Sequence, residues 1–244
     1  MVKLAKENGE TLYPKNNNAN PLDSEGEEIP LWEMSPDKLI AFIDYCEGEG
    51  ITFVATEWGT PSIDVLKKDD RVVLVTVFRN PLARFQSNFR FSYFNGYVDC
   101  KDPFDYVGSL GAHTMFNYYC RVFSYNYDNP EPIDRDRFKK ALRNVSFFDL
   151  FGFLESDEPL REISKGLGWT RHRMKANETK LDCKSAARYV LKGRPKLLFR
   201  RLRLREPEKE KDFADVFRKK NKWDFKLYNK VKEIYSRCKT STIL

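Results

Sequence analysis

Arg79 and Ser87 are the two side chains of this sequence whose types and spacing best suit anion chemistry. Arg79 follows the apolar run VVLVTVF at 72–78, and Ser87 comes eight positions later in LARFQSNFRFSYF. Asn80 and Pro81 make a sharp junction between them, and proline suits the first position of a helix. A guanidinium, a hydroxyl and a helix N-terminus that converge on one point form a phosphate site. The spacing alone favours the simpler interpretation, in which Arg79 forms surface salt bridges and Ser87 is an ordinary helix residue.

The elements around this pair predict a parallel sheet. Residues 72–78 are almost continuously apolar, which is typical of a strand buried on both faces. Residues 51–57 and 148–154 are rich in apolar, β-branched and aromatic side chains and are predicted to be strands of the same sheet. Strands joined through helices indicate parallel α/β topology. Arg79 then lies at the carboxyl edge of a central strand, where such folds bind ligands.

The rest of the chain predicts helices arranged in one domain, 1–244. Residues 9–34 form a polar loop rich in Asn and Pro, after which Ser35 caps an amphipathic helix. The helix after Pro81 places Leu82, Phe85, Phe89 and Tyr93 on one stripe. Further helices are predicted near 61–68, 103–109, 113–125, 135–142 and 157–167, and in the charged C-terminal third, whose core face comprises Trp223, Phe225, Leu227, Tyr228, Val231 and Ile234.

The net charge of +7 and the isoelectric point near 9.0 favour an anionic partner. Seven basic residues and no acidic one lie between Lys192 and Arg205, so this segment alone equals the net charge. It is either a solvated basic face or a surface for an acidic glycan, a phosphorylated cofactor or nucleic acid. No recognised nucleic-acid motif accompanies it, which makes nucleic acid the least favoured partner.

Composition excludes several kinds of protein. The five cysteines are too widely spaced for a zinc knuckle or a redox pair, and with two histidines they predict no metal site. The chain contains no run of eighteen apolar residues, so we expect no membrane span within it. The sequons at Asn144 and Asn177 are compatible with a secretory lumen.

The segment RNPLARFQSNF, which begins at Arg79, resembles the pattern Arg-(Asp/Asn)-Pro-x-x-Arg-x-x-Ser of sulfotransferases that use the donor 3′-phosphoadenosine 5′-phosphosulfate (PAPS). In that family the first arginine and the serine bind the 3′-phosphate of PAPS. The resemblance therefore implies that Arg79 and Ser87 bind PAPS. It also implies a three-layer α/β sandwich like that of P-loop NTPases, with a parallel central sheet.

Weaker patches of resemblance extend over roughly residues 50–238. FFDLFGFLESDEPLREISKGLGW and NKWDFKLYNKVKEIY are similar to later segments of the family, and HTMFNYYCRVFS is similar to an "NYY-x-R" segment of the Golgi-type carbohydrate enzymes. The patches imply transfer of a sulfuryl group from PAPS to a carbohydrate hydroxyl without a metal. They also imply a Golgi lumenal enzyme whose full-length form is membrane-anchored.

Glu57 is the general base that the resemblance implies. Family members place a histidine, or in some branches a glutamate, near the end of the strand that precedes the 3′-phosphate strand. Here ITFVATEWG offers Glu57 and no histidine, and a carboxylate can take the proton of an attacking hydroxyl. A strand-end charge that faces water is the alternative, in which case His113 is the next candidate.

The family's first strand and its Gly/Lys loop, which binds the 5′-phosphosulfate, have no counterpart in this sequence. The opening LAKENGETLYP resembles the end of the helix that follows this loop. We therefore expect an N-terminally incomplete domain with an unpaired position in its sheet and little turnover of its own. The alternatives are a non-catalytic remnant of the fold and an anion- or nucleic-acid-binding protein built around residues 192–205.

Overall fold

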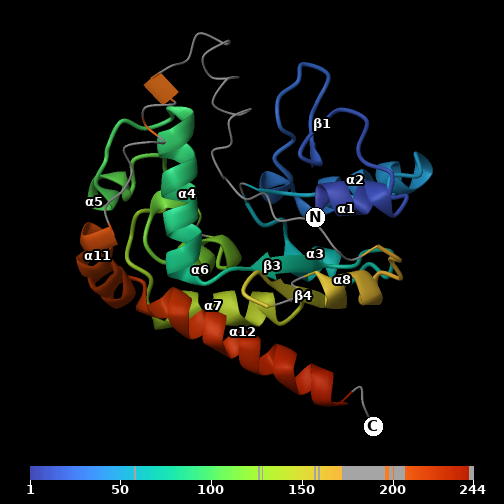
Figure 1. Cartoon of the computed structure of the whole chain (residues 1–244). Coiled ribbons are helices and arrows are strands. Elements are labelled where there is room, and N and C mark those ends of the chain that lie inside the picture. The colour runs from blue at the N-terminus through green and yellow to red at the C-terminus, as the bar shows by residue number, and fades with distance from the viewer. Residues whose placement is uncertain are drawn as a thin grey trace.

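The computed structural model describes residues 1–57, 59–125, 127, 129–156, 158, 160–171, 196–197, 200 and 207–241. Its centre is a pair of parallel strands, β3 (Val75–Phe78) and β4 (Leu150–Phe153), in which Val75 lies opposite Leu150 and Phe78 opposite Phe153. The predicted parallel topology is confirmed for these two strands. The fold is therefore a mixed α/β arrangement with a small parallel sheet (Figure 1).

Helix α4 (Pro81–Asn95) follows β3 directly, because Asn80 and Pro81 both favour a helix start. The Asn80 side chain accepts hydrogen bonds from the N–H groups of Leu82 and Ala83, at 3.1 and 3.3 Å. Gly96, with φ of 79°, ends the helix in the left-handed conformation that glycine adopts without strain. The predicted apolar stripe is confirmed: Phe85, Phe89 and Tyr93 are buried, and Leu82 is partly buried.

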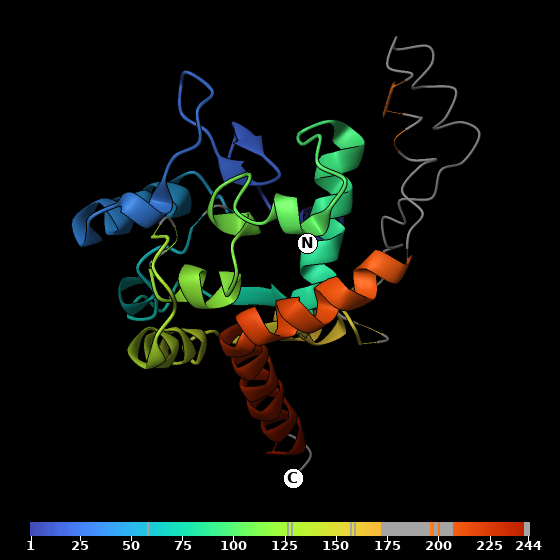
Figure 2. The ribbon, with the colours of Figure 1, turned by 90° about the vertical axis from the view of Figure 1, so that its left-hand side faces the viewer.

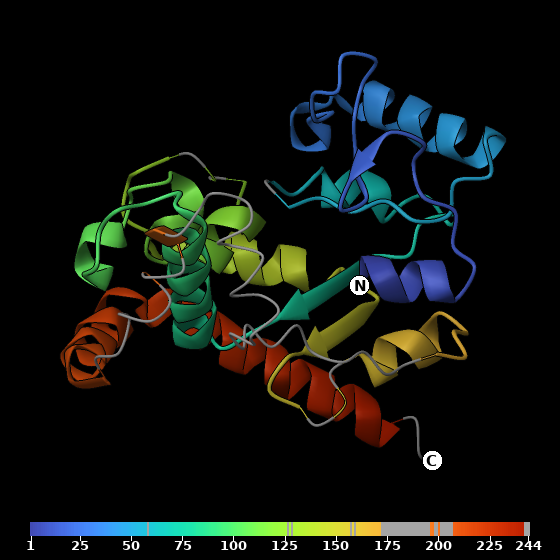
Figure 3. The same cartoon turned by 45° about the horizontal axis from the view of Figure 1, so that its top comes forward.

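Alternating side chains bury both faces of the strand pair. Leu74 and Phe78 pack with α6 (Tyr118–Phe123), α7 (Arg135–Val145) and α12 (Lys222–Ser241). Val75 and Val77 point to the opposite face, against α1 (Val2–Glu7) and α8 (Arg161–Gly166). Figure 3 shows α12 and α8 on either side of β4 and α1 beside β3. Helices thus cover the sheet on two sides, as in α/β folds.

A second apolar cluster lies beside the sheet. The stripe of α4 packs against Phe213 and Phe217 of α11 (Pro207–Lys220) and against Tyr106 of α5 (Pro103–Tyr106). Figure 2 shows α11 crossing near the lower end of α4, with α12 running away at an angle. The C-terminal helices therefore connect α4 to the sheet.

The N-terminal third carries few regular elements. Strands β1 (Asn16–Asn17) and β2 (Asn20–Pro21) form a minimal antiparallel pair within the predicted polar loop. Ser35 caps α2 (Pro36–Gly48), as predicted, through a 3.4 Å bond from the N–H of Lys38. The remaining elements are short: η1 (Leu31–Glu33), α3 (Ile63–Leu66) and η2 (Ala112–Thr114). None of the helices in the described part of the chain is long and apolar enough to cross a membrane.

Two predictions about the sheet are wrong. Residues 51–57 form no strand in the described structure, and Phe53 makes only an isolated bridge with Leu12. Their N–H groups instead donate to the N-terminal segment, for example from Ala55 to the carbonyl of Ala19. Strand β3 is also not central, because among the described residues it pairs on one side only. It is shorter than predicted as well: Val72 belongs to the preceding turn, where its N–H bonds Asp69.

Candidate functional site

The peptide of Arg79 is fixed in place by one tyrosine. The Tyr119 hydroxyl accepts a 3.0 Å hydrogen bond from the Arg79 N–H and donates a 2.9 Å bond to the Arg79 carbonyl. The Tyr119 ring packs against Phe78, the last residue of β3, with ring centroids 5.1 Å apart. Burial raises the pKa of Tyr119, so the hydroxyl keeps its proton and serves as donor and acceptor together.

The next peptide is fixed by a carboxylate from the neighbouring strand. Asn80 donates its N–H to Glu155, just beyond β4, at 2.6 Å. The second oxygen of Glu155 accepts a 2.7 Å bond from the hydroxyl of Tyr228 on α12. The loop at the carboxyl end of β3 is therefore held by side chains from α6, from the end of β4 and from α12.

The side chains of Arg79 and Ser87 are both half-buried. Within the described part of the chain, neither has a hydrogen-bond or ion-pair partner. A partly desolvated guanidinium without a counter-charge is costly unless an anion pairs with it. These two residues thus fit a phosphate group chemically.

The N-terminus of α4 offers fewer backbone hydrogen-bond donors to an anion than the sequence suggests. Pro81 has no N–H, Asn80 already occupies those of Leu82 and Ala83, and the N–H of Arg84 bonds the carbonyl of Asn80. No backbone donor of the first turn is left for a ligand. The helix can still attract an anion through its dipole, but hydrogen bonds must come from Arg79 and Ser87.

Two helices that support this loop cap each other. Asp224 of α12 accepts the N–H groups of Tyr119 and Cys120 at the start of α6, both at 2.9 Å. In return, the side-chain oxygen of Asn117 accepts the N–H groups of Trp223 and Asp224 at 3.2 and 3.4 Å. Asn221 completes the exchange by accepting the Asn117 N–H at 2.7 Å. We call Asn117, Asn221 and Asp224 the reciprocal cap; it positions Tyr119 and, through Tyr119, Arg79.

A large cavity of 1610 Å³ is lined by residues 50–57 and 59–61, by residues 71–77 before and within β3, and by residues of α4 and α6. Its lining includes Glu57 and His113, the two residues predicted from sequence as candidate bases. Arg79 and Ser87 do not line it. The structure therefore brings the two candidate bases to one cavity and places the two predicted phosphate ligands outside its lining.

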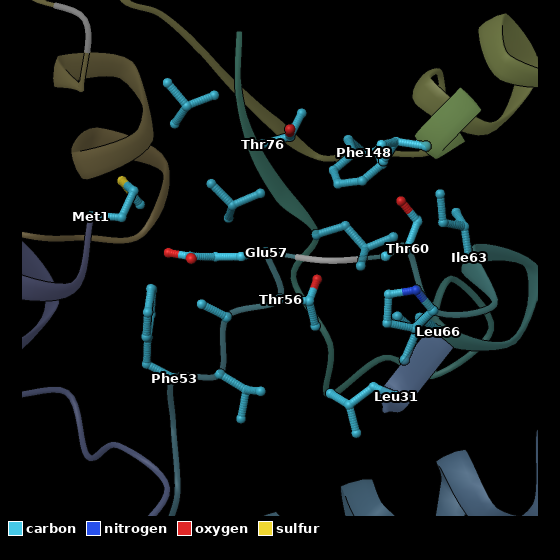
Figure 4. Close-up of a pocket in the computed structure, with 18 of the residues that line it drawn as sticks. Met1, Leu31, Phe53, Thr56, Glu57, Thr60, Ile63, Leu66, Thr76 and Phe148 are labelled. Carbon is cyan, nitrogen blue, oxygen red and sulfur yellow. The ribbon is translucent and has the colours of Figure 1, made fainter. Parts of the chain in front are cut away.

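Glu57 projects from the wall formed by residues 51–57. Figure 4 shows Phe53, Thr56 and Glu57 on one side of the cavity and Thr76 on the other. The Glu57 N–H donates to the Asn20 side chain at 2.9 Å, which fixes the backbone there. Its carboxylate is exposed to solvent, yet nearby protein atoms and the charge of Glu28 raise its pKa. A raised pKa moves a carboxylate toward the range useful for proton transfer at neutral pH.

His113 lines the same cavity and lies beside Arg84. Burial and the positive charge of Arg84 lower the pKa of His113, which favours its neutral, basic form. The Arg84 guanidinium stacks 3.9 Å above the centre of the Tyr118 ring and donates to the His113 carbonyl at 3.2 Å. Its Nε is buried without a hydrogen-bond partner in the described structure. Arg84, the second arginine of the RNPLAR segment, was not singled out from the sequence as a site residue.

The basic segment 192–205 is described only in part. Lys196, Leu197 and Arg200 belong to the structure, and the rest of the segment lies outside the described residues. Arg200 donates to the carbonyls of Tyr93 and Val98, at 3.2 and 2.8 Å, and pairs with Asp99. It therefore stabilises the C-terminal end of α4, where a cation is favourable.

Sequence reasoning missed the residues that support the loop rather than the residues that contact a ligand. Tyr119, Glu155 and Asp224 all lie within the weaker patches of family resemblance. The resemblance therefore covers these residues, but it implies no role for any of them. Their function becomes visible only when distant segments meet: Asp224 and Tyr119 are 105 positions apart.

The described residues contain no group of three His, Cys, Asp or Glu side chains that could hold a metal ion. No family model matches this chain, and neither the curated proteins nor the solved structures compared with it include a match.

The raised pKa of Glu57 predicts how stability depends on pH. Folding favours the protonated form, so the stability that Glu57 contributes is complete below the unfolded-state pKa near 4.5 and is lost as pH rises through the folded-state pKa. Glu57→Gln removes this dependence. We therefore expect the variant to gain stability relative to the parent as pH rises from the unfolded-state pKa through the raised folded-state pKa. Urea unfolding of both proteins across this range measures the effect, and a constant difference would contradict it.

Proposed function

We propose that this chain is a PAPS-dependent sulfotransferase domain acting on a carbohydrate hydroxyl. The observation that carries the proposal is the half-buried Arg79 guanidinium, without a partner among the described residues, at the carboxyl end of a parallel strand. Tyr119 and Glu155 hold its loop rigidly. Rigid placement supports a binding role, because a preorganised charged donor loses little entropy when its ligand arrives.

In this proposal Arg79 and Ser87 bind the 3′-phosphate of the donor. Arg79 supplies a charged, two-pronged donor and Ser87 a hydroxyl, a combination suited to phosphate. PAPS, when bound, supplies an activated sulfuryl group. The protein's own task is to position donor and acceptor and to neutralise developing charge, since this type of transfer needs little covalent participation from the enzyme.

Glu57 is proposed to accept the proton of the attacking hydroxyl. It is exposed to the cavity, its backbone is fixed by Asn20, and its pKa is raised. The cavity is large enough for more than one sugar unit, since small-ligand pockets span roughly 300–1,000 Å³. The neighbouring cation of Arg84 suits an acidic sugar.

Arg79→Ala is expected to weaken binding of 3′,5′-adenosine bisphosphate (PAP) by about 2 kcal/mol, or about 30-fold. The reason is the loss of a charge-assisted hydrogen bond within a partly desolvated site. Isothermal titration with PAP measures the change, and a titration with 5′-AMP isolates the share due to the 3′-phosphate.

Arg135→Ala removes an exposed arginine from the first turn of α7 and serves as the control. It is expected to leave PAP affinity unchanged. If folded Arg79→Ala binds PAP as tightly as the parent protein, the cofactor assignment fails.

A non-catalytic anion-binding protein is the second candidate. It is favoured by one observation: Glu57 lines the large cavity, whereas Arg79 and Ser87 do not. A donor at Arg79 and an acceptor beside Glu57 would then not meet. Binding of PAP without sulfuryl transfer to any member of a glycan panel would favour this candidate, whereas tighter binding of an oligonucleotide than of PAP would favour a nucleic-acid partner.

A further inference from the structure

One face of helix α4 lines the large cavity. Arg84, Asn88 and Phe91 follow one another at helical spacing, and all three contribute to the lining. The stripe that contains Phe85 and Phe89 instead packs into the second apolar cluster. Helix α4 therefore has one face for the core and another, with a cation and an amide, for the cavity.

The charge of Arg84 is not neutralised within the described structure. Among the described residues, only the carbonyl of His113 accepts a hydrogen bond from the guanidinium, and no carboxylate forms an ion pair with it. Burial raises the pKa of Asp224 and the charge of Arg84 lowers it, but both oxygens of Asp224 already accept backbone N–H groups of α6. A partly desolvated cation costs free energy unless an anion pairs with it. The cavity thus presents a positive charge that lacks a counter-ion.

Two neutral donors accompany this cation. Tyr118, whose ring lies under the Arg84 guanidinium, and Asn88 are half-buried, line the cavity and make no side-chain hydrogen bond to any residue that the structure describes. Burial raises the pKa of Tyr118, the charge of Arg84 opposes this, and the charges of Asp224 and Glu57 add to it. The hydroxyl therefore keeps its proton at neutral pH and can donate it in a hydrogen bond. We call Arg84, Asn88 and Tyr118 the carboxylate subsite.

Two exposed aromatic rings continue the same wall of the cavity. Phe91 is 56% exposed and Tyr97 is 63% exposed, their ring centroids are 5.9 Å apart, and both residues line the cavity. An aromatic ring can pack against the C–H face of a sugar and leave the sugar hydroxyls in water. Phe91 lies about 10 Å along the helix from Arg84. A ligand that contacts both must therefore be longer than one sugar unit.

We propose that this wall binds an acidic oligosaccharide, with a sugar carboxylate at the carboxylate subsite and an adjoining sugar ring against Phe91 and Tyr97. The choice of a sugar rests on the proposed function, whereas the choice of an anion rests on the charge of Arg84. A carboxylate carries one negative charge, which one guanidinium balances. A phosphate dianion would add uncompensated charge near Glu57, which lines the same cavity.

The first test compares two ligands that differ only at the carboxyl groups. The probe is a 2-aminobenzamide-labelled hexasaccharide of alternating glucuronic acid and N-acetylglucosamine, and the control is the same molecule with its carboxyl groups reduced to alcohols. Fluorescence anisotropy without PAPS measures binding to the full chain. The reduced hexasaccharide should bind at least ~10-fold more weakly, since it lacks the charge-assisted hydrogen bonds. Equal affinity for the two, or binding of neither, would overturn the subsite.

A second ligand separates a sugar carboxylate from other sources of the same group. The peptide acetyl-EGEGE-amide carries carboxylates on a flexible chain without sugar rings. It should bind at least ~10-fold more weakly than the acidic hexasaccharide, because it has no ring to pack against Phe91 and Tyr97. Equal affinity would show that any carboxylate is accepted and would overturn the assignment to a sugar.

Asn88→Asp is the sharpest protein variant, because it keeps the size of the side chain and places a negative charge beside Arg84. It should weaken binding of the acidic hexasaccharide at least ~10-fold and leave binding of the reduced one unchanged. Arg84→Gln should remove the difference between the two hexasaccharides, and Arg84→Lys should restore part of it. Arg90→Gln, on the exposed side of the same helix and outside the cavity lining, is the matched control. If Arg84→Gln does not fold, the ligand pair still decides the question on the unaltered protein.

Sulfuryl transfer from labelled PAPS distinguishes failure of the subsite from failure of the proposed function. Equal binding of the two hexasaccharides, with transfer to both at the same rate, would overturn the subsite and leave the proposed function intact. Preferential binding of the acidic hexasaccharide without transfer to any glycan would support the subsite and overturn the proposed function.

Discussion

Asp224→Ala is expected to destabilise this protein by about 3–5 kcal/mol, a large share of the stability of an ordinary domain. The Asp224 side chain is 1% exposed and accepts two N–H groups at the start of α6. Truncation leaves both donors buried without partners, and each such donor costs about 1–3 kcal/mol. It also removes the negative charge that favours the N-terminus of α6.

The same variant should loosen the candidate site. Tyr119 is held by Asp224 through its N–H and holds Arg79 through its hydroxyl. We therefore expect Asp224→Ala, where it remains folded, to weaken PAP binding although it touches no ligand. Asp224→Asn keeps one acceptor and should fall between the parent and alanine variants.

Chemical unfolding followed by circular dichroism measures the loss. Asp215→Ala on the exposed side of α11 is the matched control and should change stability by less than about 0.5 kcal/mol. A loss below about 1 kcal/mol in Asp224→Ala would show that water or local rearrangement satisfies the two donors, and that the reciprocal cap does not hold α6 in place.

Capping residues and apolar patterns predicted the elements whose structure depends only on nearby residues. Asn80, Pro81 and the apolar stripe of α4 specify that helix without help from distant residues, and Ser35 does the same for α2. The strand pair was predictable because 72–78 and 148–154 are apolar on both faces. Each of these predictions depended on residues within a few positions of one another.

Residues 51–57 show where prediction from the local sequence pattern fails. Their β-branched pattern is that of a strand, but a strand exists only when a neighbour accepts its hydrogen bonds. Their N–H groups instead donate hydrogen bonds to Thr11, Ala19 and Asn20. The sequence pattern did not predict any of these hydrogen bonds. The reciprocal cap could not be predicted either, because Asn117 and Asp224 are ordinary polar residues in the sequence and meet only when segments 107 positions apart come together.

Glu57→Gln is expected to lower sulfuryl transfer by roughly 10²–10⁴-fold, the usual share of a general base. Glutamine keeps the size of the side chain but cannot accept the proton of an attacking hydroxyl at neutral pH. PAP affinity should change less than about twofold, because Arg79 and Ser87 lie outside the cavity that Glu57 lines. The assay is transfer from labelled PAPS to a panel of neutral and acidic glycans.

The pH profile gives an independent test of the same role. A base acts in its deprotonated form, so transfer should fall as pH drops through the pKa of Glu57. Since nearby protein atoms and Glu28 raise that pKa, the fall should begin above the ordinary value of 4.5. Glu28→Gln removes one cause of the shift and should move the acidic limb to lower pH while leaving the maximum rate nearly unchanged.

His113→Gln separates the two candidate bases, because His113 lines the same cavity and its lowered pKa keeps it neutral. If Glu57 is the base, His113→Gln should cost far less than Glu57→Gln, since it alters only the surroundings of Arg84. If instead His113→Gln abolishes transfer and Glu57→Gln leaves it intact, the proton goes to the imidazole and Glu57 is a charge at the cavity wall. A Glu57→Gln variant with full activity and an unshifted pH profile would show that Glu57 is not the general base.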